Sequence, residues 1–136
     1  MGWIYLGISS DIARTCIDEY NYYAVIALGN APVTDGNWHF LCSVKDGAAF
    51  SLYQDGVLQN TITDTTAFSS TENYHIGDQS AWPTSYTGLI DDVRIYSRAL
   101  SAGEILSLYH EGGWAGSTGG AGGGAGDAAT LAPSAP

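Results

Sequence analysis

Residues 86–109 read YTGLIDDVRIYSRALSAGEILSLY and fall into two halves with different patterns. The first half is rich in β-branched and apolar residues, which predicts a strand over residues 89–96. In the second half Ser101 is a good N-cap, and Glu104 follows three residues later, so the two form a capping box. The stretch therefore predicts a strand followed by a helix.

The predicted helix covers residues 101–110, and the glycines that follow should end it. Its apolar residues Ile105, Leu108 and Tyr109 recur at the i, i+3, i+4 spacing of one helix face. Leu100, just before the cap, is placed for a hydrophobic staple with Ile105. A helix of about two to three turns is too short to be stable alone in water. We therefore expect its apolar face to pack on a sheet.

This segment resembles the closing segment of laminin-G-like domains of the concanavalin A-like jelly-roll superfamily. It matches the pattern G-x-I-D-D-V-R-I-Y-x-R-A-L-S-x-x-E-I-x-x-L-Y over residues 88–109. Two upstream pieces match in the same order, the Trp38-His39 pair at the head of a strand and the LYQDG hairpin at residues 52–56. The resemblance covers roughly residues 20–111.

The resemblance implies an all-β fold, an antiparallel β-sandwich of the concanavalin A-like jelly-roll type, with one short C-terminal helix. Members of the family carry further strands before the point where this chain begins, so it also implies an N-terminally truncated domain whose opening strands are missing. That domain would occupy residues 1–111. Residues 112–136 are rich in Gly, Ala, Ser and Pro, which predicts a disordered linker or tail.

Turn signals recur about every ten residues, which is the spacing of a β-sandwich. The pairs Asp46-Gly47 and Asp55-Gly56 separate three apolar stretches and predict a meander of three antiparallel strands. Strands are expected over residues 3–8, 12–17, 22–28, 38–45, 49–55, 57–63, 72–77 and 89–96.

Alternate residues of the strand expected over residues 38–45 are apolar, which predicts that Trp38 lies in the core. The chain has two cysteines, Cys16 and Cys42. If the strand that carries Cys42 is the third of a meander with the two strands before it, the cysteines lie two strands apart. That separation is about 9.6 Å, which is too long for a disulfide. We therefore expect two thiols.

The charge is strongly acidic, with 14 Asp and Glu against 4 Lys and Arg. This argues against nucleic acid and against anionic membrane surfaces as partners, and is compatible with a neutral sugar, a cation or a basic protein. No apolar run approaches the ~18 residues of a membrane span. The start of the chain lacks the basic region of a signal peptide. We expect an extracellular or cell-surface module tethered to further domains.

Catalytic members of the superfamily carry carboxylates at alternate strand positions in an E-x-D-x-x-E pattern, so that two lie about 5–5.5 Å apart on one face. This chain has no such triplet. Asp91 and Asp92 are adjacent and so point to opposite faces of a strand. The histidines His39, His75 and His110 lack metal-ligand spacing. We therefore expect no catalytic residues and no enzyme activity.

Asp91 is the best candidate metal ligand, with Asp92 and Asp78 as weaker ones. Asp91 should share a strand face with Val93 and Ile95 and tip toward the interior, where a carboxylate needs a partner. One partner is Ca²⁺, which prefers hard oxygen ligands and which the resemblance implies near this strand. The other is a set of backbone N–H groups from a neighbouring loop.

A glycan site is expected in the loop before the closing strand, because sugars stack on exposed aromatic rings and hydrogen-bond to Asp, Asn and Gln. The candidate residues there are Asp78, Gln79, Trp82 and Tyr86. Trp82 has a second interpretation, as a lid over the edge of the sandwich.

Two functions remain open on these grounds. One is a non-catalytic module that binds a glycan or a surface protein within a larger extracellular protein. The other is a structural or adhesive spacer with no small-molecule ligand, while a glycoside hydrolase is disfavoured by the missing carboxylates. The resemblance specifies the fold better than the ligand, because one fold hosts many functions.

Overall fold

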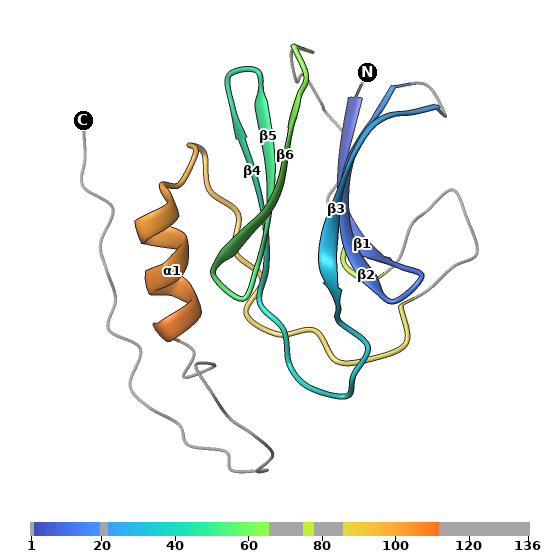
Figure 1. The fold of residues 1–136 in the computed structure, drawn as a ribbon, viewed down its shortest axis with the longest axis vertical. Helices are drawn as coiled ribbons and strands as arrows, with labels where there is room; N and C mark the ends of the chain where they lie inside the picture. The colour runs from blue at the N-terminus through green and yellow to red at the C-terminus, as the bar shows by residue number, and fades with distance from the viewer. Residues whose placement is uncertain (1, 20–21, 66–74, 78–85, 112–136) are drawn as a thin grey trace.

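The computed structural model describes residues 2–19, 22–65, 75–77 and 86–111. Within them six strands form two three-stranded antiparallel sheets, ordered β1-β2-β3 and β4-β5-β6, with one helix beside them (Figure 1). The elements are β1 (Gly2–Ser9), β2 (Ile12–Glu19), β3 (Tyr22–Pro32), β4 (Leu41–Asp46), β5 (Ala49–Gln54), β6 (Val57–Thr63) and α1 (Ala102–Glu111). The all-β sandwich with a short C-terminal helix is confirmed.

The hairpin turns follow from residues that tolerate positive φ. Asp55 and Gly56, between β5 and β6, have φ of 54° and 77°, as the two central residues of a type I′ turn require. Ser10 and Asp11 join β1 to β2 with φ of 52° and 69°. The predicted meander β4-β5-β6 is confirmed, because β5 pairs antiparallel with β4 on one side and with β6 on the other.

The two sheets face each other, with β1 opposite β4, β2 opposite β5 and β3 opposite β6. Between them lies a small core, whose buried members are Ala13, Ala27, Val33 and Leu52, with Ile8, Leu41 and Ile62 packed against it. β5 contributes its alternate residues Phe50 and Leu52, both fully buried, as its period-two pattern predicts.

A hydrogen bond between two hydroxyl groups joins the sheets across the core. The buried Thr15 hydroxyl on β2 accepts a hydrogen bond from Ser43 Oγ on β4 at 2.7 Å. Thr15 in turn donates to the carbonyl of Tyr5 on β1 at 3.0 Å. A buried hydroxyl is costly unless it is hydrogen-bonded, so these two bonds let a polar pair lie between the sheets.

The inner face of β4 is not the one that the sequence pattern predicted. Leu41 packs against the core and Ser43 bonds to β2, so the odd-numbered residues face the opposite sheet. Phe40, on the other face, lies against Tyr109 of α1 with ring centroids 6.2 Å apart. The apolar alternation was therefore real, but it belongs to the side of the sheet that the helix covers.

The expectation that Trp38 lies in the core is wrong. β4 begins only at Leu41, so Trp38 lies in the loop before the strand, and 47% of its surface is exposed. The condition used for the two cysteines, a meander of β2, β3 and β4, does not hold, because β4 belongs to the second sheet. Cys16 and Cys42 therefore lie in different sheets, and no disulfide joins them.

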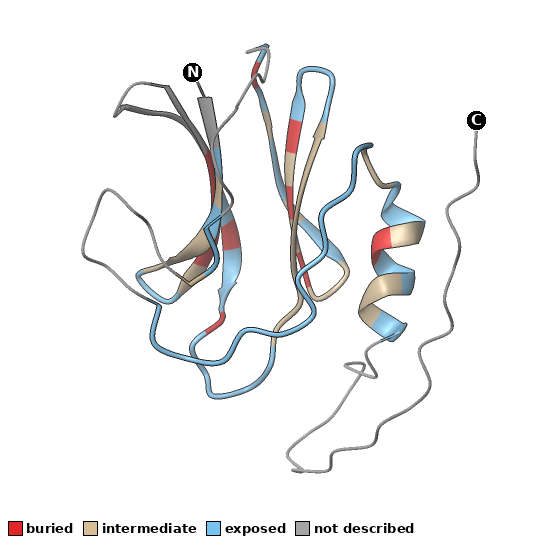
Figure 2. Ribbon diagram, turned by 180° about the vertical axis from the view of Figure 1, so that it is seen from behind, coloured by how far each residue is buried: buried red, intermediate tan, exposed pale blue. Residues whose placement is uncertain are grey.

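The closing strand is the largest departure from expectation. Residues 89–96, all of them described, are not in a strand, and all of them are exposed (Figure 2). Leu89 has 75% of its surface exposed. Strand propensity needs the backbone of a neighbouring strand before it can form a ladder, and the sheet pairings described involve β1 to β6 alone. Residues 75–77, the described part of another expected strand, are not in a strand either.

α1 lies against the outer side of the β4-β5-β6 sheet (Figures 1 and 2). Its start carries the predicted capping box: Ser101 N donates to Glu104 Oε2 at 2.8 Å, and Glu104 N donates to Ser101 Oγ at 3.3 Å. Ile105 is fully buried. The described residues include no helix that is both long and apolar enough to cross a membrane.

Candidate functional site

The loop between β3 and β4 is shaped by its own polar residues. Asp35 Oδ1 accepts a hydrogen bond from Asn37 N, and Asp35 Oδ2 accepts one from Asn37 Nδ2, each at 2.9 Å. Gly36, between them, has φ of 87°, a conformation that favours glycine. Asp, Gly and Asn at these positions are typical of a turn in which an Asx side chain bonds to the backbone two residues on.

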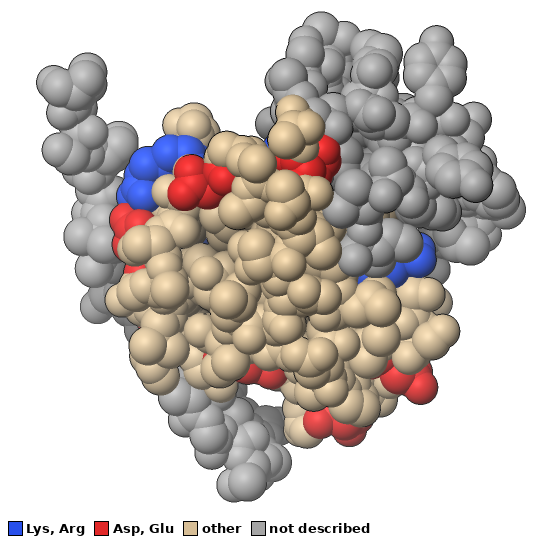
Figure 3. Space-filling view, turned by 45° about the horizontal axis from the view of Figure 1, so that its top comes forward, with Lys and Arg blue, Asp and Glu red and all other residues tan. Residues whose placement is uncertain are grey.

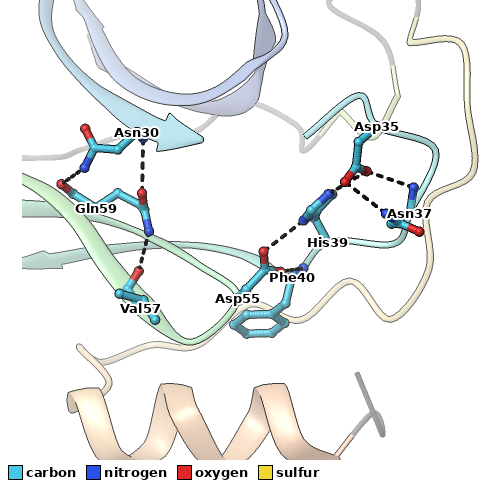
Figure 4. Close-up of polar contacts among 8 residues, drawn as sticks. All are labelled: Asn30, Asp35, Asn37, His39, Phe40, Asp55, Val57 and Gln59. Carbon is cyan, nitrogen blue, oxygen red and sulfur yellow. Dashed lines mark hydrogen bonds and ion pairs between the residues drawn. The ribbon is translucent and has the colours of Figure 1, made fainter. Parts of the chain in front are cut away.

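His39 joins this loop to the turn between β5 and β6 (Figure 4). Its Nε2 lies 3.0 Å from Asp35 Oδ1, and its Nδ1 lies 2.8 Å from Asp55 Oδ2. The other oxygen of Asp55 accepts a hydrogen bond from Phe40 N at 3.0 Å, and Asp55 N donates to the Phe40 carbonyl at 2.8 Å. The Trp38-His39 pair and the Asp55-Gly56 turn, which match the family separately in sequence, are therefore one hydrogen-bonded unit in the fold.

The electrostatics of this unit favour charged forms. Burial of the ring alone would lower the pKa of His39, but hydrogen bonds to Asp55 and Asp35 and the charges of both carboxylates outweigh it, so this pKa is raised. For Asp35, hydrogen bonds from the Asn37 backbone, the Asn37 side chain and His39 lower the pKa to about 2. The arrangement is that of an imidazolium between two carboxylates.

A second polar link closes the β3–β6 side of the sandwich. Asn30 Nδ2 donates to the Gln59 carbonyl at 2.9 Å, and Asn30 N donates to Gln59 Oε1 at 3.1 Å (Figure 4). Gln59 Nε2 donates to the Val57 carbonyl at 3.3 Å. These amides fasten two edge strands together, so they serve the fold rather than a reaction.

The candidate glycan residues are only partly described. Asp78, Gln79 and Trp82 lie outside the described residues. Tyr86 is described, with 45% of its surface exposed. Its backbone N–H donates to the Gly77 carbonyl at 2.9 Å. Gly77, which directly precedes the predicted site, is thus joined to Tyr86, the last residue of that site.

Asp91 and Asp92 are both exposed, so the expectation that Asp91 tips into the interior is wrong. The reason is that residues 89–96 do not join a sheet and therefore have no buried face. Asp91 Oδ1 accepts a hydrogen bond from Asp92 N at 2.8 Å. Asp92 has φ of 51°, a left-handed conformation that Asp adopts more readily than most residues.

Arg94 occupies both oxygens of Asp92. Its Nε and Nη2 donate to Asp92 Oδ1 and Oδ2, each at 2.9 Å, and its Nη1 donates to Glu111 Oε2 at 2.8 Å. Glu111 and Asp92 both raise the pKa of Arg94. This guanidinium ties the exposed segment to the last residue of α1.

The described donor set does not fit Ca²⁺, which takes about six to eight oxygen ligands. Both oxygens of Asp92 accept from Arg94, and Asp91 contributes one exposed carboxylate. Across the described parts of the chain, no group of three or more His, Cys, Asp or Glu side chains is placed to hold a metal ion.

Sequence reasoning missed the role of His39, Asp35 and Asp55, because it treated the first as a strand residue and the last as a turn signal. A histidine four residues after Asp35, the residue that begins the Asx turn, was the available signal, but its second partner lies 16 residues away in the chain. Trp38 was also missed as a surface aromatic. The loop that carries it and the segment that begins at Tyr86 lie at the same end of the sandwich (Figure 1).

The surface seen in Figure 3 is largely uncharged across its middle, with Asp and Glu at its edges and few Lys or Arg.

Burial raises the pKa of the half-buried Cys42 thiol to about 11, so this thiol is protonated near neutral pH. It therefore lacks the thiolate that a nucleophile needs.

Comparison with known proteins places the chain among jelly rolls. Residues 3–106 match the family model described as the concanavalin A-like lectin/glucanases superfamily. A search of curated proteins gave no match. One similar solved structure is a 2.1 Å crystal structure of an S-layer domain-containing protein, residues 221–444, from Clostridium thermocellum ATCC 27405. It is 28% identical with a TM-score of 0.44, and the match covers 78% of this chain and 55% of that chain.

Proposed function

Because this chain belongs to the concanavalin A-like lectin/glucanases superfamily, we propose that it is a non-catalytic binding module that recognises a neutral glycan. The proposal includes an extracellular or cell-surface location and attachment to further domains. The acidic net charge of −10 is compatible with an uncharged or basic partner and unfavourable for a polyanion.

The proposal rests on the different roles of carboxylate and aromatic residues at the end of the sandwich where the β3–β4 loop lies. Asp35 and Asp55 are hydrogen-bonded to His39, to Asn37 and to the backbone, so both brace loops. The loop that carries Trp38 and the segment that begins at Tyr86 lie at the same end of the sandwich (Figure 1). Both aromatic residues are exposed. Acid–base hydrolysis of a glycoside needs two carboxylates flanking the scissile bond, whereas binding needs exposed aromatic faces with polar neighbours.

Tyr86 is the described member of the expected glycan site and supports its location. Its hydrogen bond to Gly77 ties together the two ends of the stretch that contains Asp78, Gln79 and Trp82. We infer that Tyr86 and Trp82 stack on the sugar ring while Asp78 and Gln79 bond to its hydroxyls.

The test is binding to an array of neutral oligosaccharides, followed by calorimetric titration of any hit. Tyr86→Ala and Trp82→Ala should each weaken binding by about tenfold, equivalent to about 1.4 kcal/mol. Tyr96→Ala is a matched control, because Tyr96 is 43% exposed against 45% for Tyr86. Its affinity should stay at the wild-type value.

The spacer hypothesis predicts a different result. If the folded wild-type chain binds no glycan on the array, the binding proposal fails and a structural or adhesive spacer is favoured. If glycan binds but Tyr86→Ala and Tyr96→Ala behave alike, a lectin function stands at another location.

A further inference from the structure

The positions of the two carboxylates around the His39 ring favour its protonated form. Its two ring nitrogens face two carboxylate oxygens, at 3.0 Å for Nε2 to Asp35 and 2.8 Å for Nδ1 to Asp55. A neutral imidazole has one N–H donor and one lone pair, while an imidazolium has two N–H donors. A carboxylate accepts hydrogen bonds but donates none when ionised. Both contacts can therefore be hydrogen bonds only while the ring is protonated.

Two carboxylates act on the His39 ring and favour its protonated form. The carboxylates that act on it are Asp35, from its own loop, and Asp55, from the β5–β6 turn. The side chain is only 15% exposed. α1 packs nearby, where the Tyr109 ring contacts Phe40 and His110.

The hydrogen bond from His39 to Asp55 is held more firmly than the one to Asp35. Asp55 is held in place by two hydrogen bonds with the backbone of Phe40. Asp35 is more exposed, 45% against 30% for Asp55, and both of its oxygens already accept from Asn37. A neutral His39 should therefore keep the proton on Nδ1, bonded to Asp55, and lose the one on Nε2.

We propose that His39 is a proton-operated clasp on the β3–β4 loop. As an imidazolium it ties the loop at residues 35–38 to the β5–β6 turn. When Nε2 loses its proton, its lone pair faces the Asp35 carboxylate, and this side of the loop is released. The exposed Trp38 lies between Asp35 and His39 in the sequence, so the clasp controls how mobile the Trp38 ring is.

The pH range of the clasp follows from both partners. The carboxylate of Asp35 has a pKa of about 2 and stays ionised down to strongly acidic pH. The pKa of His39 lies above its ordinary value. The loop is therefore tied at mildly acidic pH and is released as the pH rises through the pKa of His39. This inference does not depend on glycan binding.

Nuclear magnetic resonance of the whole chain tests the clasp directly. The ring signals of His39 should titrate with a pKa above about 6.5, and nitrogen shifts above that pKa should show the tautomer protonated at Nδ1. The backbone signals of residues 35–38 should titrate with the same midpoint. Their order parameters should fall from rigid values toward about 0.6 at high pH.

Two variants separate the clasp from a general effect of charge. Asp35→Asn should lower the pKa of His39 and leave residues 35–38 without a pH-dependent change. Asp46→Asn is the control, because it removes one exposed carboxylate from the end of β4 and should leave the His39 titration unchanged. A His39 pKa at or below about 6.5, a neutral ring protonated at Nε2, or a loop that ignores the titration would each overturn the proposal.

Discussion

Gly56 is the residue at which two constraints meet. It follows Asp55 in the β5–β6 turn with φ of 77°, and α1 packs directly over it. A Cβ built there would lie 2.9 Å from Leu106 Cδ1 and 3.2 Å from Tyr109 Cδ1. Glycine is therefore needed both for the left-handed backbone and for the close approach of the helix.

Gly56→Ala should destabilise the domain more than Gly47→Ala does. Gly47 also has positive φ, 53°, but a Cβ there would meet open space. Forcing alanine into the left-handed region costs about 1–2 kcal/mol at either position, and overpacking against α1 adds about 1 kcal/mol or more at Gly56. Denaturant midpoints of the two variants measure the difference. Equal midpoints would mean that the helix does not press on the turn.

Protonation of His39 stabilises the folded state. Its folded pKa is raised, so its contribution is fully present below the unfolded pKa of about 6.5 and is lost as pH rises through the folded pKa. Asp35 has the opposite sign, because its pKa is lowered to about 2. Its contribution is present above about 3.9 and is lost as the pH falls toward 2.

At the scale of the element, α1 depends on its cap and on one buried residue. Ser101 and Glu104 exchange hydrogen bonds at its start, and Ile105 is the residue that it buries completely. Leu108, which the spacing places on the same face, is only half-buried. The periodicity therefore identified the correct face but not the residue that inserts most deeply.

Three substitutions in α1 should rank by burial and capping. Ile105→Ala should cost about 2–5 kcal/mol, and Leu108→Ala less, because a half-buried side chain leaves a smaller cavity. Ser101→Ala should cost about 0.5–2 kcal/mol through the lost cap. Urea denaturation gives all three values. A larger loss for Leu108→Ala than for Ile105→Ala would show that Leu108, and not Ile105, is the residue of this face that inserts most deeply.

Glu104 makes the helix start sensitive to acid. Arg98 chiefly, and then the backbone and hydroxyl of Ser101, lower the pKa of Glu104 to about 2 from an ordinary 4.5. A lowered folded pKa adds stability above about 4.5, and this stability is lost as pH falls toward 2. Glu104→Gln should therefore reduce stability near neutral pH and flatten the decline between those limits.

Denaturant midpoints measured at several pH values test this prediction. Some acid sensitivity should remain in Glu104→Gln, because Asp35 titrates in the same window. The double variant with Asp35→Asn should be flatter again. An acid decline as steep in Glu104→Gln as in the wild type would contradict the prediction.

At the scale of the whole molecule, the sandwich is held differently on its two flanks. On the β3–β6 side, Asn30 and Gln59 bond across the sheets. The segment of residues 86–98 is exposed throughout and is tied to α1 through Arg94 and Glu111. Among the residues whose burial is described, the apolar core between the sheets is therefore supplemented by polar links.

Calcium should have no effect on the stability of this chain. Asp91 accepts a backbone hydrogen bond and Asp92 is held by Arg94, so neither is prepared as a ligand. A Ca²⁺ site at 100 times its dissociation constant would add about 2.7 kcal/mol, which raises the melting temperature of a small domain by several degrees. Melting scans with calcium and with a chelator should coincide.

Asp91→Asn provides the control for that experiment. It should be only mildly destabilising, because Asn can still accept the hydrogen bond from Asp92 N. A calcium-dependent rise in melting temperature that disappears in Asp91→Asn would make Asp91 a metal ligand.

The features that sequence alone predicted correctly are those that depend on near neighbours. The β4-β5-β6 meander follows from two turns and the strands beside them, and the helix start follows from Ser101 and Glu104, three residues apart. Each of these is determined by bonds or spacings within a few residues of the same chain segment.

Tertiary structure decided what depends on partners far along the chain. Residues 89–96 have the composition of a strand but stay outside the sheets, because a ladder needs a second backbone at its edge. Phe40 has the pattern of a core residue but packs on α1, because the sheet has two apolar sides and alternation does not say which one faces the other sheet. His39 becomes a clasp only because the fold brings Asp55 to its second nitrogen.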